Sequence, residues 1–233
     1  GLNIPQEGTL TVDSITTSDP KASLRTLRQR VGLVFQYPED QLFEETIFKD
    51  IAFGPKNLKL PESEITERVR WAMEAVGLNY DTMRDESPFE ISGGQKRRVA
   101  IAGVLALRPS YLILDEPTAG LDPHGRDEIL KTVRKLYDDN PDMTIILVTH
   151  SMEDIAEQAN RIIVVDKGCL VMDGTPHAIF ARRKELEAIG LTVPQVTQLM
   201  QRLREAGLAL DDSAITVEEA VTALSAYLNG KEA

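Results

Sequence analysis

Two adjacent carboxylates, Asp115 and Glu116, directly follow the apolar run Tyr111–Leu114. Such a run predicts a buried strand, and the carboxyl ends of strands form the edge at which open α/β sheets bind ligands. At that edge Asp115 could bind Mg²⁺, and Glu116 could orient or deprotonate an attacking water. The alternative is a strand that runs into a solvated turn, because Asp-Glu-Pro after a strand is not a rare sequence.

A second stretch, Ser92-Gly93-Gly94-Gln95, begins a helical pattern that extends to Leu107. Ser92 is a favourable N-cap, and the two glycines leave backbone N–H groups open to an anion at the positive end of the helix dipole. Three basic residues that follow add positive charge nearby: Lys96, Arg97 and Arg98. The stretch therefore predicts phosphate binding, with an ordinary capped helix as the alternative.

Two more polar residues follow predicted strands. His150 comes directly after the strand pattern 144–149, where its imidazole could contact a γ-phosphate. Gln36 comes directly after the strand pattern 31–35, and its amide could reach a metal ion or a water. For each residue taken alone, the alternative is an ordinary loop side chain without a ligand.

The elements that position these residues alternate between apolar strands and amphipathic helices, which predicts an α/β fold with a mainly parallel sheet. Further strand patterns cover residues 8–12, 162–166 and 170–173, the last two joined by a hairpin turn at Lys167-Gly168. Further helical patterns cover residues 64–76, 127–137 and 152–159, and Gly77 is placed to end the first of them. Residues 36–60, which contain Pro38, Gly54 and Pro55, are expected to be irregular.

The same patterns divide the chain into three parts. Residues 37–90 interrupt the alternation of strands and helices and predict a separate helical subdomain. Beyond Thr175 only helical patterns return, at 176–188, 193–206 and 217–228, so residues 176–233 are expected to form a helical C-terminal appendage. Residues 1–36 and 91–175 remain as the α/β core.

Composition excludes several classes of function. The 233 residues carry a formal net charge of −11, which argues against nucleic-acid binding through phosphate contacts. Cys169 is the single cysteine, so no internal disulfide can form, as in proteins of a reducing compartment. The three histidines lack zinc-ligand spacing. No uninterrupted apolar run approaches the ~20 residues that a transmembrane helix needs.

Taken together, the order of these features resembles the ABC ATPase family, whose RecA-like core is of the P-loop NTPase type. Asp115 and Glu116 match its Walker B motif, and residues 91–95 match its signature motif, with Ile91 where Leu is usual. Gln36 matches the Q-loop, Ala119-Gly120-Leu121-Asp122 the D-loop, and His150 the switch histidine. Several longer stretches resemble the ATP-binding subunits of energy-coupling factor transporters: 41–46, 52–57, 87–90, 97–107, 122–126 and 193–196.

The resemblance implies a head-to-tail pair of ATP-binding subunits, identical or homologous, that hydrolyse Mg-ATP. Ser92, Gly93, Gly94 and Gln95 would bind the γ-phosphate of the ATP held by the partner. In the chain's own site, Asp115 and Gln36 would serve the Mg²⁺ and the attacking water, with Glu116 as general base. His150 would sense the γ-phosphate, and Asp122 would communicate across the dimer.

The resemblance also implies partners in the membrane. The surface from Gln36 to Glu90 would receive a transmembrane energy-coupling subunit at the cytoplasmic face of the cell membrane. A separate substrate-capture subunit would take up a vitamin or a transition-metal ion such as cobalt or nickel. The helices after Thr175 would contribute to subunit pairing.

One expected motif, Gly-x-x-x-x-Gly-Lys-Ser/Thr, does not occur in the 233 residues. This loop cradles the ATP phosphates, and in the family it lies before the position that Gly1 matches. Residues 1–8 resemble the end of the helix that follows it, so we expect a strand-loop-helix unit, on the order of 30 residues, to be missing. Two explanations stay open: a truncated sequence, or a natural form that only donates its signature motif to a partner's site. In either case we expect the chain alone to be inactive.

Two other functional classes compete with a transport ATPase. An ABC ATPase that acts on nucleic acid would predict a basic surface or a second cassette, and the net charge of −11 points the other way. A non-enzymatic interaction subunit would differ from the transport ATPase in one respect: its native gene would encode no phosphate-binding loop.

Overall fold

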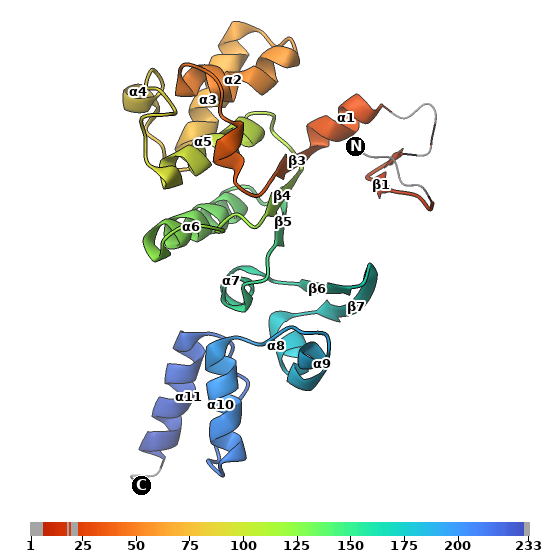
Figure 1. Cartoon of the computed structure of the whole chain (residues 1–233), viewed down its shortest axis with the longest axis vertical. Helices are drawn as coiled ribbons and strands as arrows, with labels where there is room; N and C mark the ends of the chain where they lie inside the picture. The colour runs from red at the N-terminus through yellow and green to blue at the C-terminus, as the bar shows by residue number, and fades with distance from the viewer. Residues whose placement is uncertain (1–6, 18, 20–22, 231–233) are drawn as a thin grey trace. The chain divides into compact units, whose positions relative to one another are not determined.

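The computed structural model in Figure 1 describes residues 7–17, 19 and 23–230. Its contacts divide the chain into two compact units, Gly1–Val148 and Thr149–Ala233. The sequence groups residues up to 175 with the core, whereas this division falls at the end of a strand, after Val148. The functional domain boundaries at residues 36, 90 and 175 stay a prediction. The helix end predicted within residues 1–6 lies outside the described residues.

A parallel three-stranded sheet forms the centre of the first unit. Its strands are β3 (Val31–Val34), β4 (Tyr111–Asp115) and β5 (Thr144–Val148), in the order β3-β4-β5. All three strands were predicted from their apolar runs, and β4 lies in the middle with neighbours on both sides. Leu112 and Leu114 of β4 are fully buried, so this strand anchors the sheet in the core.

The first unit contains six α-helices among its described residues (Figure 1). They are α1 (Leu24–Arg30), α2 (Ile47–Asn57), α3 (Glu62–Ala75), α4 (Tyr80–Met83), α5 (Gly93–Leu105) and α6 (Pro123–Asp139), with a short 3₁₀ helix, η1 (Pro38–Gln41). Five of them, α2 to α6, contribute to one hydrophobic core, whereas α1 contacts β3. α5 contacts α2, α3, η1 and β3, which makes it the helix that joins the others to the sheet. Gly77 follows α3 with φ of 74° and ends it as predicted.

The prediction that residues 36–60 are irregular is wrong, because α2 occupies Ile47–Asn57. The side chain of Thr46 caps this helix by accepting a hydrogen bond from the Lys49 N–H at 3.2 Å. Ile47, Ile51 and Pro55 recur every four residues and form its buried face. Pro55 has no backbone N–H to donate within the helix. It lies in the last turn, so the helix loses this hydrogen bond only near its end.

A small hairpin precedes the sheet and is tied to β4. It consists of β1 (Thr11–Val12) and β2 (Ile15–Thr16), which pair antiparallel. The Tyr111 hydroxyl at the start of β4 donates a hydrogen bond to the Asp13 carboxylate at 2.6 Å, and Arg30 pairs with the other carboxylate oxygen. The hydrogen bond from Tyr111, and then that from Arg30, hold the pKa of the Asp13 carboxyl below its usual value.

The second unit contains a hairpin and five helices among the described residues. β6 (Ile162–Asp166) and β7 (Cys169–Gly174) pair antiparallel, and Lys167 and Gly168 form the predicted turn with φ of 49° and 77°. The helices are α7 (Met152–Gln158), α8 (Pro176–Phe180), α9 (Arg183–Ala188), α10 (Gln195–Glu205) and α11 (Val217–Asn229). The single helix predicted over 176–188 is therefore two short helices, because the backbone leaves the helical conformation at Arg182.

Gly32 of β3 sets how closely α5 approaches the sheet. A Cβ at this position would lie 2.6 Å from Val104 Cγ1 and 3.0 Å from Pro109 Cγ. Gly32→Ala should therefore lower the free energy of unfolding by about 1–3 kcal/mol, because the added methyl overpacks the contact. Urea unfolding followed by the fluorescence of Trp71, the single tryptophan, measures this change.

Gly103→Ala is the matched control, since a Cβ at Gly103 of α5 meets no heavy atom within 4 Å. This substitution should be neutral or should stabilise the chain by up to about 1 kcal/mol, because alanine favours a helix more than glycine does. Equal stabilities for the two variants would contradict the close approach of α5 to β3.

Candidate nucleotide site

Parallel pairing brings the predicted site residues of the first unit to one edge of the sheet. Val34 of β3 lies beside Leu114 of β4, and Asp115 lies beside Val148 of β5. Gln36 follows β3 by two residues and Glu116 follows β4 by one, so both lie where the carboxyl ends of the strands meet. The sequence-based placement of Gln36, Asp115 and Glu116 at a common edge thus agrees with the register of the sheet.

Glu116 adopts an unusual backbone conformation. Its φ is 48°, in the left-handed region that non-glycine residues rarely occupy. The Glu116 N–H donates a hydrogen bond to the Val148 carbonyl at 2.8 Å, which holds the backbone to the neighbouring strand. Strained backbone of this kind concentrates at functional sites, where the surrounding structure fixes a side chain in one direction.

Ser92 caps α5 as predicted. Its hydroxyl accepts a hydrogen bond from the Gln95 N–H at 3.3 Å, and the Gln95 side-chain oxygen accepts one from the Ser92 N–H at 3.0 Å. These two bonds form a capping box, which fixes the first turn of the helix. In this structure the Gln95 amide therefore has a local structural role.

Gly93 and Gly94 are not required by the packing of the chain itself. A Cβ at either position would meet no heavy atom within 4 Å, and neither residue has a positive φ. Alanine would stabilise a helix more than glycine does, so the packing of this chain gives no reason for glycine here. The first turn of a helix also carries N–H groups without partners inside the helix. Phosphate binding by this stretch stays a prediction beside its capping role.

Arg97 does not add exposed positive charge to the start of α5, and that part of the prediction is wrong. The Arg97 side chain is 1% exposed. Its Nε and Nη2 donate to the two carboxylate oxygens of Glu39 at 3.0 and 2.6 Å, and its Nη1 donates to the carbonyls of Pro117 and Ala119, both at 2.8 Å. The guanidinium faces the interior because these acceptors satisfy it there.

The sequence offered one signal for this burial. Arg97 precedes the buried Ile101 by four residues and Leu105 by eight, so all three share one face of α5. Burial alone would raise the pKa of the Glu39 carboxyl. The hydrogen bonds from Arg97, a hydrogen bond to the Glu39 backbone and the charge of Arg97 together outweigh it, and this pKa lies below its usual value. Glu39 is therefore an ionised partner of Arg97.

Asp122 caps α6. Its carboxylate accepts a hydrogen bond from the Gly125 N–H at 2.8 Å, and a Cβ on Gly125 would lie 2.9 Å from the same carboxylate oxygen. Glycine at position 125 thus permits the cap. The role of Asp122 across a dimer stays a prediction beside this local role.

His150 belongs to the second unit and follows the end of β5 by two residues. It is exposed. The next residue, Ser151, donates its N–H to the Thr149 hydroxyl at 3.1 Å and caps α7. Contact between His150 and a γ-phosphate stays a prediction.

The predicted metal ligands fit Mg²⁺ in their chemistry. Asp115 offers a carboxylate and Gln36 an amide oxygen, and Mg²⁺ is commonly bound by one or two carboxylates together with substrate phosphates. Among residues 7–17, 19 and 23–230, no three His, Cys, Asp or Glu side chains form a group that could hold a metal ion. A Mg²⁺ ion bound by Asp115 and Gln36 would share its coordination with the nucleotide, as this ion commonly does.

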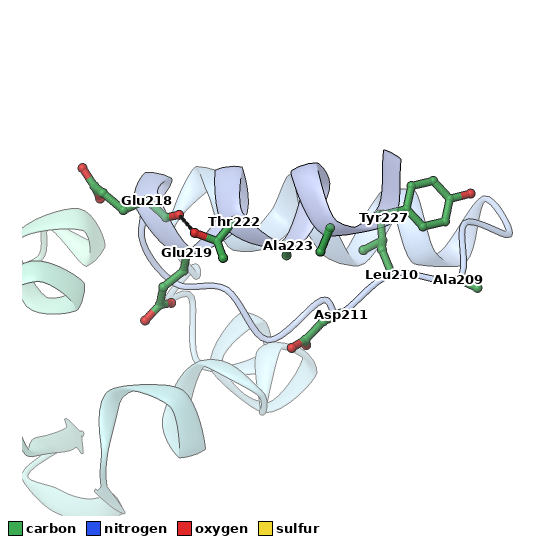
Figure 2. Close-up of a pocket in the computed structure, with 9 residues that line it drawn as sticks. Ala209, Leu210, Asp211, Glu218, Glu219, Thr222, Ala223 and Tyr227 are labelled. Atoms are coloured by element: carbon green, nitrogen blue, oxygen red, sulfur yellow. Dashed lines mark hydrogen bonds between the residues drawn. The ribbon is translucent and has the colours of Figure 1, made fainter. Parts of the chain in front are cut away.

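A hollow in the second unit is unsuited to ATP. The hollow has a volume of about 560 Å³. Figure 2 shows its lining, between α11 and the segment around Asp211. Its lining carries the carboxylates of Asp211, Glu218 and Glu219 and no Lys, Arg or His. A nucleotide phosphate would be repelled there, so this hollow does not compete with the edge of the central sheet.

Within the described part of the chain, no helix combines the length and apolar character that a membrane span requires.

Comparisons with known proteins agree with this arrangement. A family model described as ABC transporter matches residues 1–119. The energy-coupling factor transporter ATP-binding protein EcfA2 of Clostridium tetani is 54% identical over 231 residues, which cover 99% of this chain and 80% of that protein. The protein of the same name from Symbiobacterium thermophilum is also 54% identical, over 232 residues that cover 100% of this chain and 80% of its own length.

A solved structure is similar as well. It is titled "Structure of cbiO1 from clostridium perfringens: Part of the ABC transporter complex cbiONQ", and it matches with a TM-score of 0.70 and 36% identity over 86% of this chain and 79% of that one. The fold and the site thus define an ABC-type ATP-binding protein. Within that class, the chain belongs to the family of energy-coupling factor transporter ATP-binding proteins.

Proposed function

We propose that this chain is the motor subunit that hydrolyses ATP to power an energy-coupling factor importer of vitamins or transition-metal ions. The observation that carries the proposal is the meeting of Gln36, Asp115 and Glu116 at the carboxyl edge of one parallel sheet. This edge is where open α/β folds bind their ligands. The sequence relatives named as energy-coupling factor ATP-binding proteins support the transport role.

The proposed chemistry assigns one task to each group. Asp115 and Gln36 bind the Mg²⁺, which neutralises charge on the phosphates when it is present. Glu116 accepts a proton from the attacking water, and its fixed backbone aims the carboxylate. His150 contacts the γ-phosphate and reports its loss.

The proposed partner at the nucleotide is a second ATP-binding subunit. Ser92, Gly93, Gly94 and Gln95 bind the γ-phosphate of the ATP held by that partner, through backbone N–H groups at the start of α5. The open space at Gly93 and Gly94 supports this role, because it leaves room for another molecule. Asp122 lies on the same unit and communicates with the partner.

The proposed partner in the membrane docks on residues 36–90, at the cytoplasmic face. Phe43, Phe53 and Phe89 are exposed on this segment, and the rings of Phe43 and Phe53 lie edge to face with centroids 5.0 Å apart. The Asp50 carboxylate accepts the Phe43 N–H at 2.9 Å and so fixes the loop. Exposed aromatic groups held in place are typical of protein interfaces. The substrate-capture subunit acts through the transmembrane subunit.

Helices α10 and α11 of the second unit contribute to pairing of the ATP-binding subunits in this proposal. Val217, Val221 and Leu228 lie exposed along α11, three apolar side chains that a partner would cover. Nucleic acid is not among the proposed partners, because the net charge of −11 opposes it.

The alternative form of the proposal concerns the 233 residues taken by themselves. They contain no Gly-x-x-x-x-Gly-Lys-Ser/Thr loop, and Asp115 and Glu116 alone would repel an anionic nucleotide. We therefore expect calorimetric titration of Mg-ATP into these 233 residues to give no detectable binding. Micromolar binding would mean that another segment supplies the phosphate contacts, and would remove the alternative of a subunit that only donates its signature motif.

Glu116→Gln tests the proposed general base in the full-length gene product assembled with its partners. ATP binding should persist, because the amide keeps the size of the carboxylate. Turnover should fall at least ~100-fold, because the amide cannot accept the proton. Release of phosphate and binding of a labelled ATP analogue measure the two effects separately. Wild-type turnover in this variant would exclude Glu116 as the base.

Gly94→Asp tests the proposed contact with the partner's ATP. The side chain has room within the chain, and a carboxylate in the first turn of a helix is favourable, so circular dichroism should be unchanged. Turnover should nevertheless be abolished, because the carboxylate occupies and repels the phosphate position.

Gly103→Asp serves as the control, because it adds the same carboxylate to α5 at another position where a Cβ meets no heavy atom within 4 Å. Turnover in this control should stay near that of the wild type. Loss of helical signal in Gly94→Asp alone would support the plain-cap alternative.

A further inference from the structure

The buried guanidinium of Arg97 joins segments that are far apart in the sequence. Two of its nitrogens donate to the Glu39 carboxylate at 3.0 and 2.6 Å, and the third donates to two carbonyl oxygens, of Pro117 and Ala119, at 2.8 Å each. With the side chain 1% exposed, water cannot replace a lost partner. Displacing any of these segments would leave a buried charge unsatisfied.

Each of these segments adjoins a candidate site residue. Arg97 itself follows the signature stretch 92–95 by two residues. Glu39 follows Gln36 by three residues, Pro117 comes directly after Glu116, and Ala119 precedes Asp122 by three. One side chain of α5 thus bonds both to the loop after Gln36 and to the segment 117–119 between Glu116 and Asp122.

Tyr37 reinforces the same junction. Its φ of 54° places it in the left-handed region directly after Gln36. Its ring lies 3.1 Å from where a Cβ on Gly120 would be, and 6.0 Å from the Arg97 guanidinium. The loop after Gln36 and the segment before Asp122 are therefore packed against each other as well as bonded through Arg97.

We propose that Arg97, with Glu39, is a positioning residue that couples the two ATP sites of the assembled dimer. This inference rests on the proposed function, in which residues 92–95 bind the partner's ATP while Gln36, Asp115 and Glu116 serve the chain's own ATP. The bonds of Arg97 connect these two sets within one chain. A displacement of the signature helix at one ATP is thereby transmitted to the general base at the other.

A purely structural ion pair is the competing explanation, and α5 supplies a matched control at its other end. Arg68 is also mostly buried, with 15% of its side chain exposed. It pairs with Glu64 at 2.7 Å and donates to the carbonyls of Ala106 and Leu107, both at 3.3 Å. Arg68 therefore joins α3 to the end of α5 without touching a segment that carries a candidate site residue.

The test compares Arg97→Lys and Glu39→Gln with Arg68→Lys and Glu64→Gln in the full-length gene product paired with its partner ATP-binding subunit. The membrane subunit is left out, because Arg68 and Glu64 lie in the segment 36–90 that is proposed to dock it. Lysine keeps the charge but cannot reach three acceptor groups at once, and glutamine keeps the shape of Glu39 but removes its charge. We expect kcat for ATP hydrolysis to fall about 10-fold in the first pair, while KM for ATP changes less than about 3-fold. In the control pair kcat should stay within about 2-fold of the wild type, even where the melting temperature falls as far as it does in the Arg97 and Glu39 variants.

A double variant, Arg97→Lys with Glu39→Gln, should lose little more activity than the worse single variant, because the two residues act through one contact. Equal loss of kcat in the Arg97 and Arg68 pairs, after matching for melting temperature, would overturn the inference. If Arg97→Lys does not fold, Glu39→Gln against Glu64→Gln decides the same question.

Hydrogen exchange separates this inference from the proposed function. In the nucleotide-free full-length protein, Glu39→Gln should speed exchange about 10-fold in both 36–41 and 117–121, whereas Glu64→Gln should leave both segments unchanged. A wild-type assembly without ATPase activity would refute the proposed function, and the exchange result would still decide whether Arg97 and Glu39 couple the segments. Faster exchange in only one of the segments, or in neither, would overturn the coupling.

Discussion

The parallel pairing of β4 with β3 and β5 is the constraint on which the candidate site depends. Parallel strands run in the same direction, so whatever follows each strand gathers at a single edge. The apolar side chains of Leu112 and Leu114 fix the register, because a slip by one residue would turn them out of the core. The carboxylates of Asp115 and Glu116, to which we assign the chemistry in the proposed function, are thus positioned by hydrophobic burial a few residues away. Neither carboxylate has to contribute to the stability of the sheet.

The second constraint is the hydrogen bonding that holds two strained residues in place beside the buried Arg97. Tyr37 and Glu116 both adopt left-handed conformations just beyond neighbouring strands, and such strain persists only where the surroundings hold it. The Val148 carbonyl holds the backbone of Glu116 directly, and Arg97 holds the next residue, Pro117. A buried arginine costs desolvation and adds little net stability, even where each of its three side-chain nitrogens donates a hydrogen bond. Its value in this fold is geometric, since its acceptors cannot move independently.

The sequence predicts those parts of the structure whose cause is local. The three strands of the central sheet each carry an apolar run, and Ser92 with Gln95 three residues later forms the capping box that its spacing indicates. α2 was missed because Gly54 and Pro55 suggest a break, while the helix ends soon enough to tolerate both. The burial of Arg97 was missed for a different reason. Its charge predicts exposure, and the acceptor that reverses this, Glu39, lies 58 residues away in the chain.

The glycines of the first unit show which residues the internal packing of the chain explains and which it does not. The approach of Val104 accounts for Gly32, and at Gly125 the carboxylate that caps α6 lies where a Cβ would be. Gly93 and Gly94 have no such internal reason, and neither has Gly103. Open space alone therefore does not identify a contact. What distinguishes Gly93 and Gly94 is their position in the first turn of α5, where backbone N–H groups lack helical partners and a side chain would stand between them and an anion. In the proposed function the reason for these two glycines is the partner's ATP, whose γ-phosphate would come within hydrogen-bonding distance of this backbone.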